Sequence, residues 1–114
     1  MKGAVKMVVI VNGPIMGRGS EELGGRLLGS FLNKLSFWKA AEKVIFYNEG
    51  VKLLAEGSPY LVDLTLLEEG GVELLACGTC LDYFQLREKI KVGRVSSMDE
   101  IVNAIAQADN VVTI

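Results

Sequence analysis

Five short apolar runs rich in valine and isoleucine recur along the chain, and longer segments with helical spacing separate them. The runs cover residues 5–11, 44–47, 72–76, 92–95 and 110–114. Most show little alternation between polar and apolar side chains, which is typical of strands that are covered on both faces. Strands that alternate with helices require crossover connections and therefore a mostly parallel sheet. The sequence predicts a three-layer, doubly wound α/β fold with five strands.

The segments between these runs carry recognisable helix starts and stops. Ser20 precedes two glutamates and a series of leucines at helical spacing, so we expect it to cap a helix. Ser58 with Pro59 predicts the start of a second helix, which would run to about Glu69 and end at Gly70. Two further pairs match the spacing of a capping box, namely Thr79 with Asp82 and Ser97 with Glu100.

Length and composition are those of a single globular domain. The 114 residues are expected to form one domain, residues 1–114, and 50% of them are hydrophobic while 23% are charged. The net charge is -2, and no basic stripe gathers along the sequence. Because nucleic-acid binding needs such a stripe to displace counterions from phosphates, we expect no nucleic-acid partner.

The opening stretch MKGAVKMVVIVNGP could be a signal peptide, because two lysines precede an apolar run. The run from Met7 to Val11 is too short for that purpose, and no small-residue cleavage site follows it. No segment reaches the roughly 20 apolar residues that are needed to span a bilayer. We therefore expect no membrane partner and a cytoplasmic location, in which thiols stay reduced.

The residues that follow the first three runs are candidate site residues, because open parallel sheets bind ligands beyond the carboxyl ends of their strands. They are Asn12 and Arg18 after the first run, Asn48, Glu49, Gly50 and Val51 after the second, and Cys77, Gly78 and Thr79 after the third. The glycine-rich stretch GPIMGRGS matches neither a phosphate-binding loop nor a dinucleotide fingerprint. We interpret its glycines as loop formers.

Both cysteines of the chain, Cys77 and Cys80, lie at this predicted site, and the chain has no histidine. If Thr79 caps the following helix, the cysteines flank the positive end of that helix, which favours thiolate over thiol. We therefore expect their pKa values to fall below the free value of about 8.5. Arg18 and Lys52, on neighbouring loops, would add positive charge. The thiols can thus be activated without a histidine.

Four interpretations fit the spacing of the cysteine pair. In the first, Cys77 is a small buried hydrophobe and Cys80 is incidental. In the second, the pair supplies half of a zinc site that two subunits share. In the third, it cycles between dithiol and disulfide, although the tryptophan and the cis-proline of thioredoxins are missing. In the fourth, Cys77 accepts a sulfur atom as a persulfide and passes it on.

Several stretches, spread over nearly the whole chain, occur together in a known family. They are GRGSEELGGRLLGSFL at residues 17–32, FYNEGVKL at 46–53, CGTCLDYF at 77–84, LREKIKVGRVSSM at 86–98 and the closing ADNVVTI. Together they resemble the DsrE-like sulfurtransferase family. The resemblance is greatest to the DsrE-like domain of YedF-type proteins, which are described as sulfurtransferase-like and are associated with selenium metabolism.

The resemblance implies a doubly wound α/β fold, homo-oligomers that are often built on trimers, and a reactive cysteine after a central strand. Cys77 is the position that matches this cysteine, and Cys80 is the second cysteine of the YedF-like variant. By this resemblance Cys77 receives sulfur from one protein and hands it to another, while Cys80 resolves or stabilises the persulfide. A TusA-like carrier or a cysteine desulfurase would be the donor.

We therefore expect a cytoplasmic sulfur-relay protein that uses no cofactor and no metal. The amides around Gly78 to Cys80 would hold the developing sulfur anion, and the residues after the second strand would form the opposite wall, namely Asn48, Gly50 and Val51. Glu49 would raise the pKa of the thiols by its negative charge. The alternatives are a dithiol redox module and a protein that binds a small ligand or a metal without chemistry.

Two expectations concern partner proteins. YedF-type proteins usually carry an additional TusA-like domain with a Cys-Pro-x-Pro motif, which this sequence does not show, so we expect the sulfur donor to be a separate protein. Phe37 and Trp38 end the first long helix as large apolar residues. They would cover either the sheet or a neighbouring subunit.

Overall fold

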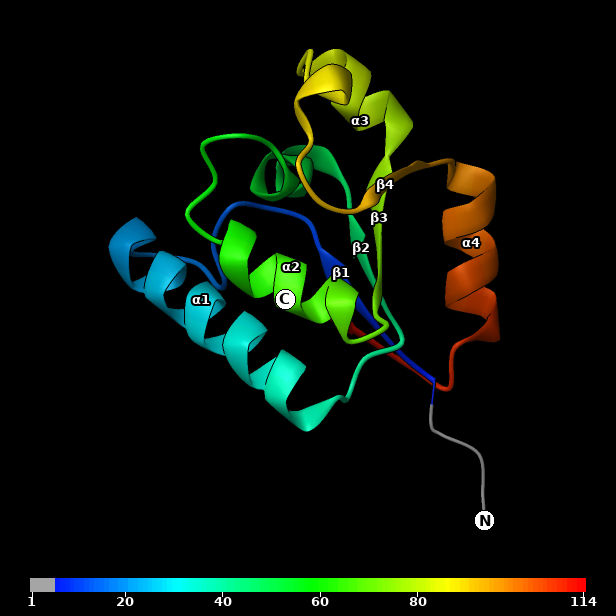
Figure 1. The fold of residues 1–114 in the computed structure, drawn as a ribbon, viewed down its shortest axis with the longest axis horizontal. Helices are drawn as coiled ribbons and strands as arrows, with labels where there is room; N and C mark the ends of the chain where they lie inside the picture. The colour runs from blue at the N-terminus through cyan, green and yellow to red at the C-terminus, as the bar shows by residue number, and fades with distance from the viewer. Residues whose placement is uncertain (1–5) are drawn as a thin grey trace.

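The computed structural model describes residues 6–114, which form one parallel sheet with helices on both faces (Figure 1). The elements in chain order are β1 (Met7–Val11), α1 (Glu21–Trp38), β2 (Lys43–Phe46), the 3-10 helix η1 (Asn48–Leu54), α2 (Leu61–Glu69), β3 (Glu73–Cys77), α3 (Gly78–Tyr83), the 3-10 helix η2 (Arg87–Lys89), β4 (Arg94–Ser96), α4 (Met98–Gln107) and β5 (Asn110–Thr113). No described helix is both long enough and apolar enough to cross a membrane.

The strands lie in the order β4-β3-β2-β1-β5, and every neighbouring pair is parallel. In Figure 1, α1 and α2 lie on one face of the sheet and α4 lies on the other. The chain thus steps outward from β1 to β4 and then returns through α4 to place β5 on the far side of β1. This arrangement confirms the predicted three-layer α/β fold with five parallel strands.

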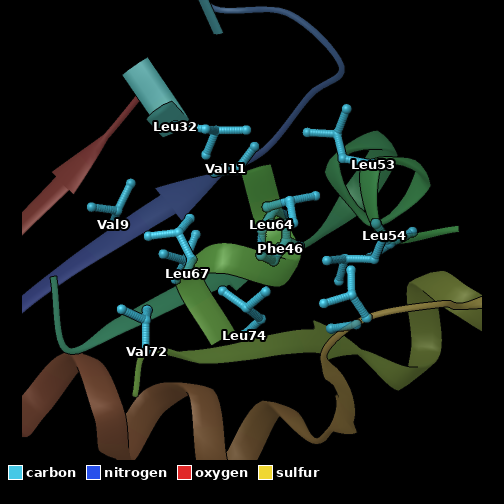
Figure 2. Close-up of a cluster of buried hydrophobic side chains, with 14 of the residues drawn as sticks. Val9, Val11, Leu32, Phe46, Leu53, Leu54, Leu64, Leu67, Val72 and Leu74 are labelled. Carbon is cyan, nitrogen blue, oxygen red and sulfur yellow. The ribbon is translucent and has the colours of Figure 1, made fainter. Parts of the chain in front are cut away.

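Alternate side chains of β1, β2 and β3 supply two separate cores. Val9, Val11, Phe46 and Leu74 point toward α1 and α2, where leucines such as Leu32 pack against them (Figure 2). The side chains between them pack on the opposite face with α4, and this smaller core contains Val8, Ile10, Ile45, Leu75, Cys77, Ile101 and Ala104. Burial on both faces explains why the strands are nearly continuous apolar runs in the sequence.

All five predicted strands are present, and their ends differ from the predicted ones by one or two residues. Val5, the predicted start of the first strand, lies outside the described residues. The third run is displaced by one residue to Glu73–Cys77, and the fourth begins two residues late, at Arg94. Val92 is still buried, because the segment before β4 already packs against the core formed with α1 and α2.

Of the predicted caps at Ser20, Ser58 and Ser97, the first and the last are confirmed and the one at Ser58 is wrong. Ser20 Oγ accepts the N–H of Leu23 at 3.1 Å, and Ser97 Oγ accepts the N–H of Glu100 at 3.2 Å. Ser58 does not cap α2, which begins only at Leu61. Its hydroxyl accepts the N–H of Tyr60 instead, so it closes a local turn before the helix, a common alternative for serine.

A chain of charged side chains joins the beginnings of β2, β3 and β4 to α4. Lys43 Nζ lies 2.8 Å from Glu73 Oε2, and Arg94 Nη2 lies 2.9 Å from Glu73 Oε1. Arg94 also binds Glu100, whose Oε1 accepts the buried hydroxyl of Ser96 at 2.6 Å. Arg94 and then Ser96 lower the pKa of Glu100 to about 2. The network therefore holds α4 on the sheet through an ionised carboxylate.

We predict that Glu100→Gln removes an acid-sensitive part of the stability. The contribution of ionised Glu100 is complete above its ordinary pKa of 4.5 and is lost as the pH falls toward about 2, because the folded protein lowers this pKa. Urea titrations between about pH 7 and about pH 2.5 should show wild type more stable at neutral pH and the two proteins converging in acid. Glu88→Gln, a change in exposed η2, is the control and should track wild type; a pH-independent difference for Glu100→Gln would contradict the assignment.

Candidate functional site

The start of η1 and the helix α3 line a pocket at the carboxyl end of the sheet. Its volume is about 360 Å³, and its lining residues are Asn48, Thr79, Cys80, Tyr83 and Phe84. Asn48 begins η1, and the other four belong to α3 or follow it directly. The pocket lies where parallel sheets commonly bind ligands, as the sequence predicts.

β3 passes into α3 without an intervening loop. Cys77 is the N-cap and Gly78 the first helical residue, so the predicted cap at Thr79 is two residues late. Gly78 makes this sharp start possible, because a Cβ at this position would lie 2.9 Å from Arg87 Nη2 and 3.1 Å from Ser96 O. The side chain of Cys77 makes no capping hydrogen bond, and Thr79 is exposed.

The two cysteines differ in accessibility. Cys77 is only 2% exposed and packs in the smaller core among Ile45 and Leu75. Cys80 is partly buried and lines the pocket. The N-cap and the third helical residue lie on the same side of a helix, so the two thiols are neighbours. Both are free thiols in the structure.

A backbone N–H from another strand connection reaches the sulfur of Cys80. Asn48 N donates to Cys80 Sγ at 3.0 Å. Asn48 adopts φ of 52°, a left-handed conformation that asparagine and glycine accept more readily than other residues. Gly50 packs directly on the carbonyl of Val11 at the end of β1, with no room for a Cβ. This close approach holds η1, and with it the Asn48 N–H, beside the cysteine.

The pKa of Cys80 is raised above its ordinary value, whereas the sequence predicts a lowered one. Burial is the main cause, the Asn48 N–H opposes it, and the neighbouring Cys77 raises the pKa further. A thiol that loses water is harder to ionise, and here this cost outweighs the favourable hydrogen bond. Glu49, expected to raise the pKa of the thiols, lies 3.6 Å from Lys52 in an exposed ion pair.

Two aromatic residues form the outer wall of the pocket. Tyr83 is 81% exposed and meets Phe84 edge to face, with ring centroids 5.1 Å apart. Lys52 Nζ lies 4.6 Å from the centroid of the Phe84 ring. Neither Tyr83 nor Phe84 is among the site residues predicted from the sequence. Their positions, three and four residues after Cys80, were the available signal, because this spacing places residues on one side of a helix.

The structure brings only some of the predicted site residues together. Asn48, Thr79 and Cys80 line the pocket, whereas Asn12 and Arg18 are exposed outside its lining. The remaining members, Gly50, Val51, Cys77 and Gly78, are buried. Val51 belongs to the core beneath α1 and α2, because the segment after β2 is the helix η1 and turns this side chain inward.

Metal-ligating residues do not gather at this pocket. Within residues 6–114, no group of three or more histidine, cysteine, aspartate or glutamate residues could hold a metal ion. The chemistry that the described residues offer here is that of two thiols, a backbone N–H and an aromatic wall.

The pocket thus lies at the carboxyl end of a five-stranded parallel sheet, beside the strand that ends at Cys77. The sequence profile of the DsrE/DsrF-like family matches residues 6–114. The chain belongs to the DsrE/DsrF-like family. The predicted family is therefore confirmed, while the likeness to YedF-type members stays a prediction. No curated protein sequence matches the chain significantly.

Solved structures of three proteins share the fold. The ychN protein from E. coli and a protein of unknown function from Methanobacterium thermoautotrophicum each superpose with a TM-score of 0.71 at 21% identity, covering 96% of this chain and 99% of theirs. A conserved protein of unknown function from Bacteroides thetaiotaomicron has a TM-score of 0.68 at 14% identity, covering 96% of this chain and 95% of its own. These likenesses show that this α/β architecture persists at low sequence identity.

We predict that the backbone of Asn48 sets the reactivity of Cys80. In a Cys77→Ala background, Asn48→Gly should keep the left-handed turn, whereas Asn48→Val should lose it, because β-branched residues resist positive φ. The Asn48 N–H lowers the pKa of Cys80, so its loss should raise that pKa. The alkylation rate of Asn48→Val should therefore rise at a higher pH than the alkylation rate of Asn48→Gly. The measurement is the alkylation rate against pH for both variants; identical profiles would show that the N–H does not act on the thiol.

Proposed function

We propose that this protein carries sulfane sulfur on its cysteine pair and passes it between proteins in the cytoplasm. The observation that carries the proposal is the position of the pair: two free thiols lie together at the carboxyl end of the sheet, and one of them lines a pocket. Family membership supports the same proposal, because the match covers the segment that carries both cysteines and the resemblance implies a persulfide carrier. The cytoplasm suits this chemistry because thiols stay reduced there.

The pocket offers what a sulfur transfer needs. A donor persulfide must reach a protein thiol, and Cys80 lies on the pocket wall. The reacting thiol must ionise, and the Asn48 N–H lies 3.0 Å from Cys80 Sγ, where it stabilises negative charge on sulfur. The raised pKa of Cys80 keeps the free protein mainly in the thiol form, which limits side reactions until a donor is bound.

Donor and acceptor are proposed to be other proteins. A TusA-like carrier or a cysteine desulfurase would deliver the sulfur, and the exposed Tyr83 offers an aromatic surface beside the pocket for such a partner. Aromatic residues are enriched at protein interfaces.

We predict that incubation with a cysteine desulfurase and cysteine adds one sulfur atom to the protein. Intact-mass spectrometry should show an adduct of about 32 Da, the mass that a persulfide adds to a thiol. The adduct should disappear when the unfolded protein is treated with a reducing thiol. A double variant, Cys77→Ala with Cys80→Ala, is the control and should remain unmodified.

A dithiol redox module is the second candidate, because both thiols are free and adjacent. It would lose about 2 Da under mild oxidant and gain no sulfur from the donor, since oxidation only removes two hydrogens. Wild-type protein that forms the disulfide but never carries the sulfur adduct would overturn the sulfur-carrier proposal in favour of redox cycling.

We further propose that the protein is a homo-oligomer built on trimers. Phe37 and Trp38 are 75% and 72% exposed, so neither is buried on the sheet. Trp38 lines an apolar groove of about 300 Å³ between α1 and the edge of the sheet at β5, with Met7, Val9, Phe31, Leu35 and Val112. All four residues of β5 are exposed. A second copy of the chain would cover this edge, which isolated parallel sheets seldom leave open.

We predict that Trp38→Lys weakens self-association. Light scattering at micromolar concentration should show oligomers of the wild-type protein and smaller species of the variant, because lysine adds a charge to an apolar interface. Val62→Lys provides the matched control, since Val62 is 74% exposed on α2. Wild-type protein that is monomeric under these conditions would contradict the proposed assembly.

A further inference from the structure

The unequal burial of the two thiols sets an order for their use. A donor that enters the pocket meets Cys80, which lines it, whereas Cys77 is 2% exposed and lies behind it in the core under α4. The described lining of the pocket does not include Cys77. Any bulky donor therefore reaches Cys80 first.

We propose that Cys80 is the residue that receives the sulfur and that Cys77 is the residue that stores it. This inference rests on the proposed function and deepens it. It also reverses the order that the sequence resemblance implies, in which Cys77 is the first acceptor. Cys77 lies close enough to Cys80 to raise the pKa of the Cys80 thiol.

The transfer proceeds in two balanced steps. In the first, the Cys80 thiolate attacks the terminal sulfur of a donor persulfide; a new S–S bond forms to Cys80, the donor S–S bond breaks, and the donor leaves as a thiolate that takes up the proton released by Cys80. In the second, Cys77 Sγ attacks the same terminal sulfur. The S–S bond to Cys80 breaks, Cys80 becomes a thiolate, and it takes up the proton of Cys77. Neither step is a net oxidation or reduction, because each exchanges one S–S bond for another.

The surroundings of each sulfur suit its role. The Asn48 N–H, 3.0 Å from Cys80 Sγ, stabilises the thiolate of Cys80 both when it attacks and when it leaves. Cys77 belongs to the smaller core together with Ile45 and Leu75, which have 0% exposure, so a persulfide stored on it is shielded from thiols and water. Storage behind an accessible thiol keeps the sulfur from being lost to small reductants.

The test uses glutathione persulfide as donor and follows the full-length protein. In wild type, rapid alkylation followed by peptide fragmentation should locate the extra sulfur first on Cys80 and later on Cys77. Cys80→Ala should load at least about tenfold more slowly, because thiol exchange depends on access. Cys77→Ala should lose its sulfur to a reducing thiol at least about tenfold faster than wild type, because its persulfide stays on Cys80, which lines the pocket.

Each outcome separates this inference from the proposed function. Wild type that loads while Cys80→Ala loads equally fast would overturn the order and leave the sulfur-carrier function intact. The order is also overturned if sulfur is found on Cys77 first, a result that needs no variant and so does not depend on whether Cys77→Ala folds. Wild type that takes up no sulfur from either glutathione persulfide or the desulfurase would overturn both.

Discussion

The packing of η1 against the end of β1 is the constraint on which the site depends. Gly50 lies against the Val11 carbonyl with no room for a side chain, and the N–H of Tyr47 donates to the same carbonyl at 3.2 Å. Held there, the chain leaves Asn48 in a left-handed conformation with its N–H on Cys80 Sγ. The environment of the sulfur is therefore determined by β1 and β2 as much as by the strand that carries the cysteines.

One end of the sheet is held by charged side chains, and the other end bears the pocket. At the beginnings of the strands, Lys43, Glu73 and Arg94 form a charged network that reaches α4 through Glu100. At the opposite ends, the strands open onto the pocket beside Cys80. Because the sheet is wholly parallel, the ends of β2 and β3 meet at one edge, so an N–H from one connection and a thiol from the next become neighbours.

The sequence predicts the fold and the place of the site more fully than the geometry of the site. The strand at β1 and the caps at Ser20 and Ser97 were predictable because they depend on residues close in sequence. The raised pKa of Cys80 was not, because burial depends on the whole assembly. The prediction that Val51 lines the site was wrong for a similar reason, because no local pattern indicates that the segment after β2 forms a 3-10 helix.

By itself, the sequence determined that the chain folds as a parallel α/β sheet, that its two cysteines lie where the third strand ends, and that the chain belongs to a recognisable family. Apolar periodicity, capping residues and motif spacing are local properties, so they can be read along the chain. Only the tertiary structure decided which cysteine faces the pocket and which is buried. Exposure depends on what other elements cover: α4 and the inner strands enclose Cys77, while η1 leaves Cys80 open beside a backbone N–H.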